Sequence, residues 1–369
     1  MIKIFHTADL HIGMKFNNYP DSIKTSLQEA RLGVLSNMIL KANQENCNLF
    51  VVAGDLFDRI NGIDKKTIAQ AAASLEEFQG ECILVMPGNH DYDNGMIELW
   101  TSFNKSNSDK MLYINEEKSY SLNNYGLNAV VYPAPCHSKH SSTNNIGWIR
   151  EEHMGEEQVH IGIGHGAING LSPDKDLNYY NMTLDELDKI SVDLWLLGHT
   201  HVMYPPKASV TSEKIFNPGT PEPDGLDCKH LGNAWIISID DNKKVNANKV
   251  TTGTYRFIDR EFVIRDREDL DAILQVLLED NPSKTIARIH LIGRVEEEVF
   301  NYRQEIYKSI QKQIAYLIVD DTDLGIKITS EKIHKEFSDG SFPQQLLLSL
   351  SDDEDTLQLA YELIMEVKK

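Results

Sequence analysis

A short apolar run ends in a glycine and two acids at residues 48–58, which read NLFVVAGDLFD. Two similar apolar runs flank it along the chain, Ile2–Phe5 and Cys82–Met86. Short runs of this kind are typical of strands that are buried on both faces of a sheet. Apolar residues at helical spacing fill the two intervals between the runs, over 22–43 and 65–78. The order strand, helix, strand, helix, strand predicts an α/β core with a parallel sheet.

The rest of the chain continues this pattern as far as residue 255. Further strands are expected at 129–132, 160–163, 193–197, 215–216, 234–239 and 249–251, the last three as an antiparallel finish. Beyond residue 255 glycine, proline and histidine become sparse, and a βαβαβ-like pattern begins. Its strands are expected at 257–264, 285–291 and 325–328, and its helices at 270–278 and 297–315.

We therefore expect a first domain at 1–254, a second domain at 255–335 and a C-terminal segment at 336–369. The C-terminal segment contains a last predicted helix over 356–367. Four of its apolar residues form one stripe: Ala360, Leu363, Ile364 and Val367. Such a stripe packs either on its own domain or on a partner helix.

The charge of the chain is less ordinary than its composition. Its 369 residues are 41% hydrophobic and 25% charged, as expected of a soluble globular chain. They include 36 basic and 56 acidic residues, which gives a net charge of −20. Residues 256–369 hold 15 of the basic and 24 of the acidic residues, so both parts of the chain are acidic. This charge argues against a protein that grips nucleic acid or an anionic membrane through its bulk charge.

Targeting signals and cysteine pairs are not evident in the sequence. It has no run of 18 apolar residues and its start lacks the apolar segment of a signal peptide, so we expect no membrane partner. The four cysteines lie at least 35 residues apart, without a CxxC pair. A reducing, cytoplasmic location is the resulting expectation.

Polar side chains that can bind metal follow the predicted strands. They are Asp9 and His11 after the first strand, Asp55 and Asp58 after the second, Asn89 and His90 after the third, and His165, His199 and His201 after two later ones. In open α/β sheets ligands bind at the carboxyl ends of the strands, so we expect these side chains at one rim. Imidazole and carboxylate donors without thiolate suit Mn, Fe or Zn.

Each of these residues, taken alone, also has a purely structural interpretation. An Asp after a strand is often a helix N-cap, and Gly88-Asn89-His90-Asp91 is compatible with a simple turn. A lone His is usually a surface residue. Five such loops in one chain favour a shared metal site over five separate coincidences.

The motifs together resemble the calcineurin-like metallophosphoesterase superfamily. They are, in order, Asp9-x-His11, Gly54-Asp55-x-x-Asp58, Gly88-Asn89-His90-Asp91, Gly164-His165 and Gly198-His199-x-His201. The sequences around Asp9, Asp55 and Asn89, and the turn Asn217–Pro221, are similar to the double-strand-break repair nuclease branch, called SbcD in bacteria. The resemblance implies a four-layered αββα sandwich with a small α+β capping domain at 255–335 and a C-terminal helix.

The resemblance also implies roles for the strand-end residues. Two divalent ions, expected to be Mn²⁺ with Fe or Zn as alternatives, would neutralise a phosphodiester and activate water. Asp9, His11 and His201 would hold one ion, Asn89, His165 and His199 would hold the other, and Asp55 would bridge them. His90 would contact the phosphate and protonate the leaving oxygen. Asp58 is the first candidate for the residue that orients His90, and Asp91 is the second.

Two functions remain open at this point. The first is a metal-dependent DNA nuclease, an exonuclease with endonuclease activity as a further option, working in a complex with an SbcC-like SMC-type ATPase whose coiled coil would dock the C-terminal segment. The second is a stand-alone phosphodiesterase or phosphatase for a small molecule, which would share every metal ligand. The resemblance also implies a homodimer. A scaffold with a degenerate site is disfavoured because the ligand positions are intact.

Overall fold

The computed structural model of the protein describes residues 1–105, 107–152, 154–155, 158–172 and 178–368. The chain forms two compact units, Met1–Arg256 and Phe257–Lys369, each of which is described by itself. No helix of the described residues is long and apolar enough to cross a membrane.

The first unit is built on two sheets. One sheet runs in the order β4 (Met111–Tyr113), β3 (Cys82–Met86), β2 (Leu49–Ala53), β1 (Ile2–Thr7), β11 (Asn233–Ile239), β12 (Val245–Thr251) and β9 (Ser209–Thr211). The other runs in the order β10 (Ile215–Phe216), β8 (Leu194–Gly198), β7 (Val159–His165), β6 (Ala129–Ala134) and β5 (Tyr120–Ser121). Strands β1 to β4 pair in parallel, as do β6, β7, β8 and β10.

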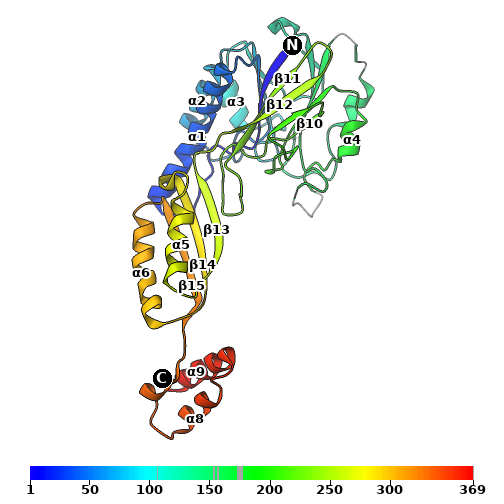
Figure 1. Ribbon diagram of the computed structural model, residues 1–369. Coiled ribbons are helices and arrows are strands. Elements are labelled where there is room, and N and C mark those ends of the chain that lie inside the picture. The colour runs from blue at the N-terminus through cyan, green and yellow to red at the C-terminus, as the bar shows by residue number, and fades with distance from the viewer. Residues whose placement is uncertain (106, 153, 156–157, 173–177, 369) are drawn as a thin grey trace. The chain divides into compact units, whose positions relative to one another are not determined.

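The two sheets pack face to face and are covered by helices on their outer faces (Figure 1). Val51 of β2 packs between the sheets with Ile161 and Leu196. Its neighbours Phe50 and Val52 point the other way, against helices α1 (Asp21–Gln44) and α2 (Lys65–Glu76). Strand β2 is therefore buried on both faces, which explains its apolar run without alternation.

The outer face of the second sheet has its own cover. There Trp195 and Leu197 of β8 pack against Leu187 of α4 (Leu184–Asp188) and Ile149 of the 3₁₀ helix η2 (Gly147–Glu151). Helix α3 (Glu98–Asn104) joins α1 and α2 on the first sheet through Trp100 and Phe103. The order helices, sheet, sheet, helices confirms the predicted four-layered αββα sandwich.

The second unit begins with a small α/β layer. Its sheet runs in the order β13 (Arg256–Val263), β14 (Thr285–Val295) and β15 (Tyr316–Ile326), and its helices are α5 (Arg267–Leu278) and α6 (Glu297–Gln311). Helices α7 (Ser330–Glu336), α8 (Phe342–Ser349) and α9 (Glu354–Lys368) follow, with a cluster of their own around Ile333, Phe337, Leu347 and Leu357. The predicted boundary between 335 and 336 falls inside α7, and the separate roles of the two parts stay predictions.

The stripe on the last helix differs from the expected one. Ala360 and Ile364 pack inward on the α7–α8 cluster, whereas Leu363 and Val367 are exposed together with Leu359.

Two other sequence expectations were wrong. Strand β10 pairs in parallel with β8 and does not belong to an antiparallel finish. Strand β15 begins at Tyr316, although a strand was expected from residue 325 onward. The acidic residues of β15 made it unlike a strand in the sequence. The Asp321 carboxylate accepts hydrogen bonds from Arg303 and Tyr307 of α6, so a charged residue is stabilised on a half-buried strand.

Candidate metal centre

The predicted donors lie where the carboxyl ends of the two sheets meet. Strands β1, β2 and β3 of one sheet lead to Asp9, Asp55 and Asn89, and strands β7 and β8 of the other lead to His165 and to His199 and His201. A hydrogen bond from His6 to the Leu197 carbonyl (3.0 Å) joins β1 to β8 just behind this meeting point.

The loops that carry the donors have an unusual backbone. Asp9, His11, Asp55 and His199 all adopt positive φ, at 56°, 48°, 52° and 87°. Such conformations cost about 1–3 kcal/mol each for residues other than glycine. Cross-loop hydrogen bonds stabilise them: Asp9 N–H donates to the Gly54 carbonyl (3.1 Å) and His11 N–H to that of Asp55 (3.0 Å). The first two loops are therefore held as one rigid pair.

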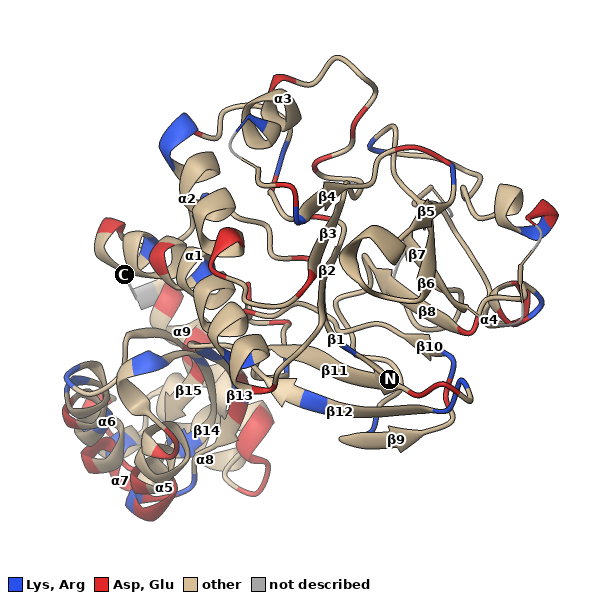
Figure 2. Cartoon of the chain, turned by 90° about the horizontal axis from the view of Figure 1, so that it is seen from above, with Lys and Arg blue, Asp and Glu red and all other residues tan. Residues whose placement is uncertain are grey.

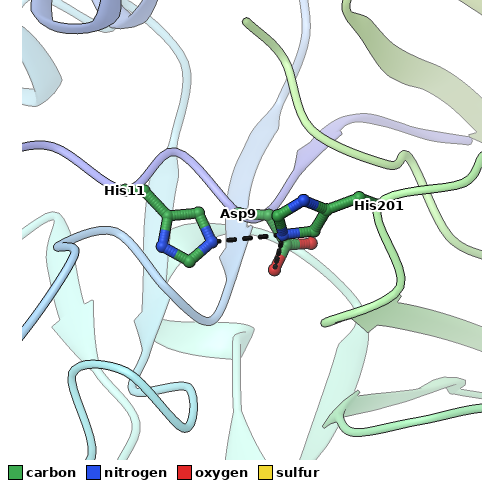
Figure 3. Close-up of side chains that lie close together, drawn as sticks. All are labelled: Asp9, His11 and His201. Atoms are coloured by element: carbon green, nitrogen blue, oxygen red, sulfur yellow. Dashed lines mark hydrogen bonds and ion pairs between the residues drawn. The ribbon is translucent and has the colours of Figure 1, made fainter. Parts of the chain in front are cut away.

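Asp9, His11 and His201 form a first donor cluster (Figure 3). The Nε2 atoms of His11 and His201 lie 3.2 Å apart, and His201 Nε2 lies 3.9 Å from Asp9 Oδ1. The Asp9 carboxylate also accepts the His199 N–H at 3.0 Å, which ties the first loop to the last one.

Asn89, His165 and His199 form a second cluster beside the first. Asn89 Oδ1 lies 3.1 Å from His165 Nε2 and 2.9 Å from His199 Nδ1. His165 Nδ1 donates to the Ala53 carbonyl (2.8 Å), so its Nε2 is the atom that can offer a lone pair to a cation when the ring is neutral.

Asp55 lies between the two clusters. Its Oδ2 is 3.6 Å from His11 Nε2 in the first cluster and 3.4 Å from His165 Nε2 in the second. A carboxylate has lone pairs for two cations, which an imidazole has not. The seven side chains therefore come together in the grouping that the resemblance implied, with Asp55 in the bridging position.

The donor set fits a pair of divalent cations. Asp9 and Asp55 are fully buried carboxylates in contact with imidazole nitrogens that face one another, and without a cation such nitrogens compete for the same proton. The oxygen and nitrogen donors, without sulfur, match Mn, Fe or Zn. The residues that would hold each ion are those of the two clusters, and this assignment stays a prediction.

His90 lies at the edge of the first cluster. Its ring packs edge-on against that of His11, with centroids 4.7 Å apart. Its main-chain N–H donates to Asp55 Oδ1 (2.8 Å), and its Nδ1 donates to the main-chain carbonyl of Asp58 (3.0 Å). This tautomer leaves Nε2 available for proton exchange.

The carboxylates of Asp58 and Asp91, the two candidates for orienting His90, contact other groups. The Asp58 carboxylate lies 3.8 Å from His11 Nδ1, so Asp58 orients His90 through its main chain and not through its side chain. The Asp91 carboxylate accepts N–H groups of Gly88 (2.7 Å) and Phe57 (3.0 Å) and so clamps two donor loops together. Burial and the nearby Asp55 charge raise the pKa of Asp91 to about 8.

Several residues that contact the donors were not found from the sequence. Asp224 accepts a hydrogen bond from His201, and the ring of Tyr179 stacks on that of His199 with centroids 5.3 Å apart. Asn217 donates to the carbonyls of Thr200 and Val202 on either side of His201. Asn217 lies in the turn singled out by resemblance, but Asp224 and Tyr179 lie in stretches without a motif.

Burial and charge act in opposite directions on the donors. Burial alone would lower the pKa of His165, but the charge and hydrogen bond of Asp55 raise it to about 9. Burial would likewise lower the pKa of His201, which the hydrogen bond to Asp224 and the charge of Asp9 raise to about 9. The pKa of Asp55 is depressed although burial opposes this, mainly because of the charge of His165.

Two glycines allow the loops to approach this closely. Gly54 has a φ of +95°, and a Cβ there would lie 2.1 Å from His165 Nδ1. A Cβ on Gly88 would lie 2.3 Å from Asp55 Oδ1 and 2.5 Å from Asp55 N. Any larger residue would displace a donor.

We predict that Gly88→Ala displaces Asp55 and weakens Mn²⁺ binding by about 10- to 100-fold, the range seen when groups that position metal ligands are lost. Titration calorimetry of the purified chain measures this. Gly33→Ala is the matched control, because its Cβ in helix α1 would meet no heavy atom within 4 Å. A folded Gly88→Ala variant that binds Mn²⁺ like the parent would contradict the geometry.

We also predict that Mn²⁺ affinity rises with pH between 6.5 and 8.5. Cations compete with protons for His165 and His201, and the pKa values of both lie near 9, so both rings are protonated at neutral pH. Affinity should increase by up to about tenfold per pH unit for each displaced proton. Calorimetry under nitrogen in buffers of different ionisation enthalpy counts those protons; an affinity that is flat over this range would show that the two rings are already neutral.

Comparison with known proteins agrees with this geometry. The family model of the calcineurin-like phosphoesterases matches residues 2–203. A relative from Bacillus subtilis (strain 168), described as an uncharacterized metallophosphoesterase YhaO, is 26% identical over 210 residues, which cover 54% of this chain. The aligned part spans about half of that relative, 48% of its length. The chain belongs to the calcineurin-like phosphoesterase family, whose members are dinuclear metal-dependent hydrolases of phosphoesters.

Proposed function

We propose that the protein is an Mn²⁺-dependent DNA nuclease that works as a subunit with an SbcC-like SMC-type ATPase. The metal centre is common to phosphoesterases of many substrates, so the proposal rests on what the chain adds to it. That addition is the second unit, Phe257–Lys369, which lies beyond the residues matched by the family model. An enzyme for a small ester does not need an α/β layer followed by three further helices.

The surroundings of the centre suit a nucleotide. Aromatic rings gather beside the metal centre: Tyr179 stacks on the donor His199 and also contacts the ring of His140. Nucleobases stack on aromatic rings for about 1–3 kcal/mol each. A stacked base next to the cations would place its own phosphate close to them.

The net charge of −20 is compatible with DNA as substrate. Two divalent cations would add four positive charges at the site, which the formal charge omits. Figure 2 shows acidic and basic residues interspersed on helices α1 and α2 and around β13 to β15. We therefore expect weak DNA binding by the chain alone and a partner that supplies the remaining grip.

The reaction would divide between the cations and the residues described above. When bound, the two ions would neutralise the phosphate oxygens and lower the pKa of the attacking water. Asp91 holds the Asn89 and Asp55 loops in register by accepting the N–H groups of Gly88 and Phe57. In its doubly protonated form, His90 would keep the Nδ1 proton on the Asp58 carbonyl and give the Nε2 proton to the leaving oxygen.

The partner would dock on helix α9. One face of α9 packs on its own domain through Leu357, but Leu359, Leu363 and Val367 are 59%, 54% and 90% exposed. They are spaced by four residues and so form one row, which suits packing against a coiled-coil helix.

The nuclease proposal predicts that the purified chain with Mn²⁺ cleaves end-labelled duplex DNA, faster when the ATPase is present. His90→Ala should reduce cleavage about 10²- to 10⁴-fold because the leaving oxygen is no longer protonated, with Mn²⁺ affinity nearly unchanged. His334→Ala, an exposed histidine of the second unit, is the control. Intact DNA in the presence of the ATPase, together with rapid hydrolysis of bis-p-nitrophenyl phosphate, would overturn the nuclease proposal and favour a small-molecule esterase.

The docking proposal predicts that Leu363→Glu abolishes both co-purification with the ATPase and its stimulation of DNA cleavage. Hydrolysis of bis-p-nitrophenyl phosphate by the chain alone should not change, because the metal centre lies in the other unit. Leu40→Glu is the matched control, since Leu40 of α1 is equally exposed at 56%. Undiminished co-purification of Leu363→Glu would place the partner elsewhere.

A further inference from the structure

His201 is held less by packing than the other two donors of the first cluster. Its side chain is 40% exposed, whereas those of Asp9, His11 and His165 are almost fully buried. Burial alone therefore cannot fix the rotation of its ring. Something else has to keep Nε2 of His201 at 3.2 Å from His11 Nε2 and in the first cluster.

The opposite edge of the His201 ring meets a carboxylate. His201 Nδ1 lies 3.2 Å from Asp224 Oδ2. Because Nδ1 and Nε2 lie on different edges of the imidazole, Asp224 stands behind the ring and is not itself part of the donor cluster. A proton on Nδ1 that is donated to Asp224 leaves the lone pair on Nε2.

Asp224 is itself held by a buried arginine of helix α1. Arg31 of α1 is 1% exposed, and its Nη2 lies 3.8 Å from Asp224 Oδ2 and donates to the Glu222 carbonyl at 3.0 Å. Its Nη1 donates to the carbonyl of Leu10, the residue between Asp9 and His11. The Arg31 guanidinium therefore binds two segments. One is the loop that carries Asp9 and His11, and the other is the turn whose Asp224 orients His201.

The main chain of His201 is fixed by a second histidine. The Gly232 N–H donates to Nδ1 of His230 (3.0 Å), which leaves the proton on Nε2, and that atom donates to the His201 carbonyl (3.0 Å). With its carbonyl and its Nδ1 both bonded, His201 has one orientation in which its lone pair reaches the cluster.

We propose that Asp224, anchored by Arg31, is a positioning residue that sets the tautomer and the orientation of His201 for metal binding at the first cluster. The proposal rests on the metal chemistry of the family and holds for any phosphoester substrate. Carboxylates placed behind metal-binding histidines raise metal affinity by about 10- to 100-fold. When Asp224 is replaced, we expect the affinity for the cation at the first cluster to fall and the affinity for the other cation to stay unchanged.

The test measures Mn²⁺ binding to the full chain by calorimetry, without DNA, so it is independent of the nuclease proposal. Asp224→Ala should weaken the binding of one of the two Mn²⁺ ions by about 10- to 100-fold. Asp224→Asn should lose less Mn²⁺ affinity than Asp224→Ala, because the amide oxygen of Asn still accepts a hydrogen bond from His201 Nδ1. Asp227→Ala, which removes the same charge from an exposed residue of the same loop, should bind both ions like the parent.

A second measurement separates positioning from a general loss of structure. In ¹⁵N-histidine NMR of the chain without metal, at a pH above the pKa of about 9 of His201 so that the parent ring is neutral, the Nδ1 proton of His201 should be present in the parent and in Asp224→Asn, and lost to a mixture of tautomers in Asp224→Ala. Thermal unfolding should show that all variants remain folded at the temperature of the measurements, although the midpoint of Asp224→Ala should fall because the buried Arg31 loses its partner. Parental Mn²⁺ binding in a folded Asp224→Ala variant, or an equal loss in Asp227→Ala, would overturn the proposal.

Discussion

Two carboxylates, those of Asp9 and Asp55, lie buried side by side at the centre of the first unit, and most of the surrounding structure serves to balance them. A buried charge is costly unless it is paired or bonded. Asp9 accepts the N–H of His199, Asp55 accepts that of His90, and imidazoles from both sheets surround the pair. Without metal, protons on His165 and His201 offset these charges, and metal cations can take the place of those protons. A site of that kind is suited to bind the negative oxygens of a phosphoester.

The same constraint explains why the loops are strained. To aim two acids and two imidazoles at one point, the backbone takes left-handed conformations at Asp9, His11, Asp55 and His199. Hydrogen bonds between neighbouring loops stabilise these conformations, and the absence of a Cβ at Gly54 and Gly88 leaves room for them. The donors are consequently set before any ligand arrives, which is the arrangement that favours transition-state binding.

The sequence was sufficient to single out the side chains that the structure brings together, but not the residues that support them. Asp9, Asp55, Asn89, His165 and His199 stand directly after apolar strands, a local pattern that can be read without a structure. The meeting of two sheets at the site cannot be read in this way, because it depends on pairing between distant segments.

Residues that hold the donors were hidden for the same reason. Arg31 and Glu222 are 191 residues apart, and Asp224 follows no motif. The orientation of His90 by a main-chain carbonyl is equally invisible, because a carbonyl belongs to every residue and only geometry selects Asp58. The fold prediction failed at β15 because the partners of its Asp321 lie on α6, far from it in the sequence.

We propose that these strand-end residues form one centre for two cations. Crystals grown with Mn²⁺ and measured for anomalous scattering test it directly. The account predicts two anomalous peaks in the first unit, one among Asp9, His11 and His201 and one among Asn89, His165 and His199, with Asp55 between them. A single peak, or peaks away from Asp55, would contradict it.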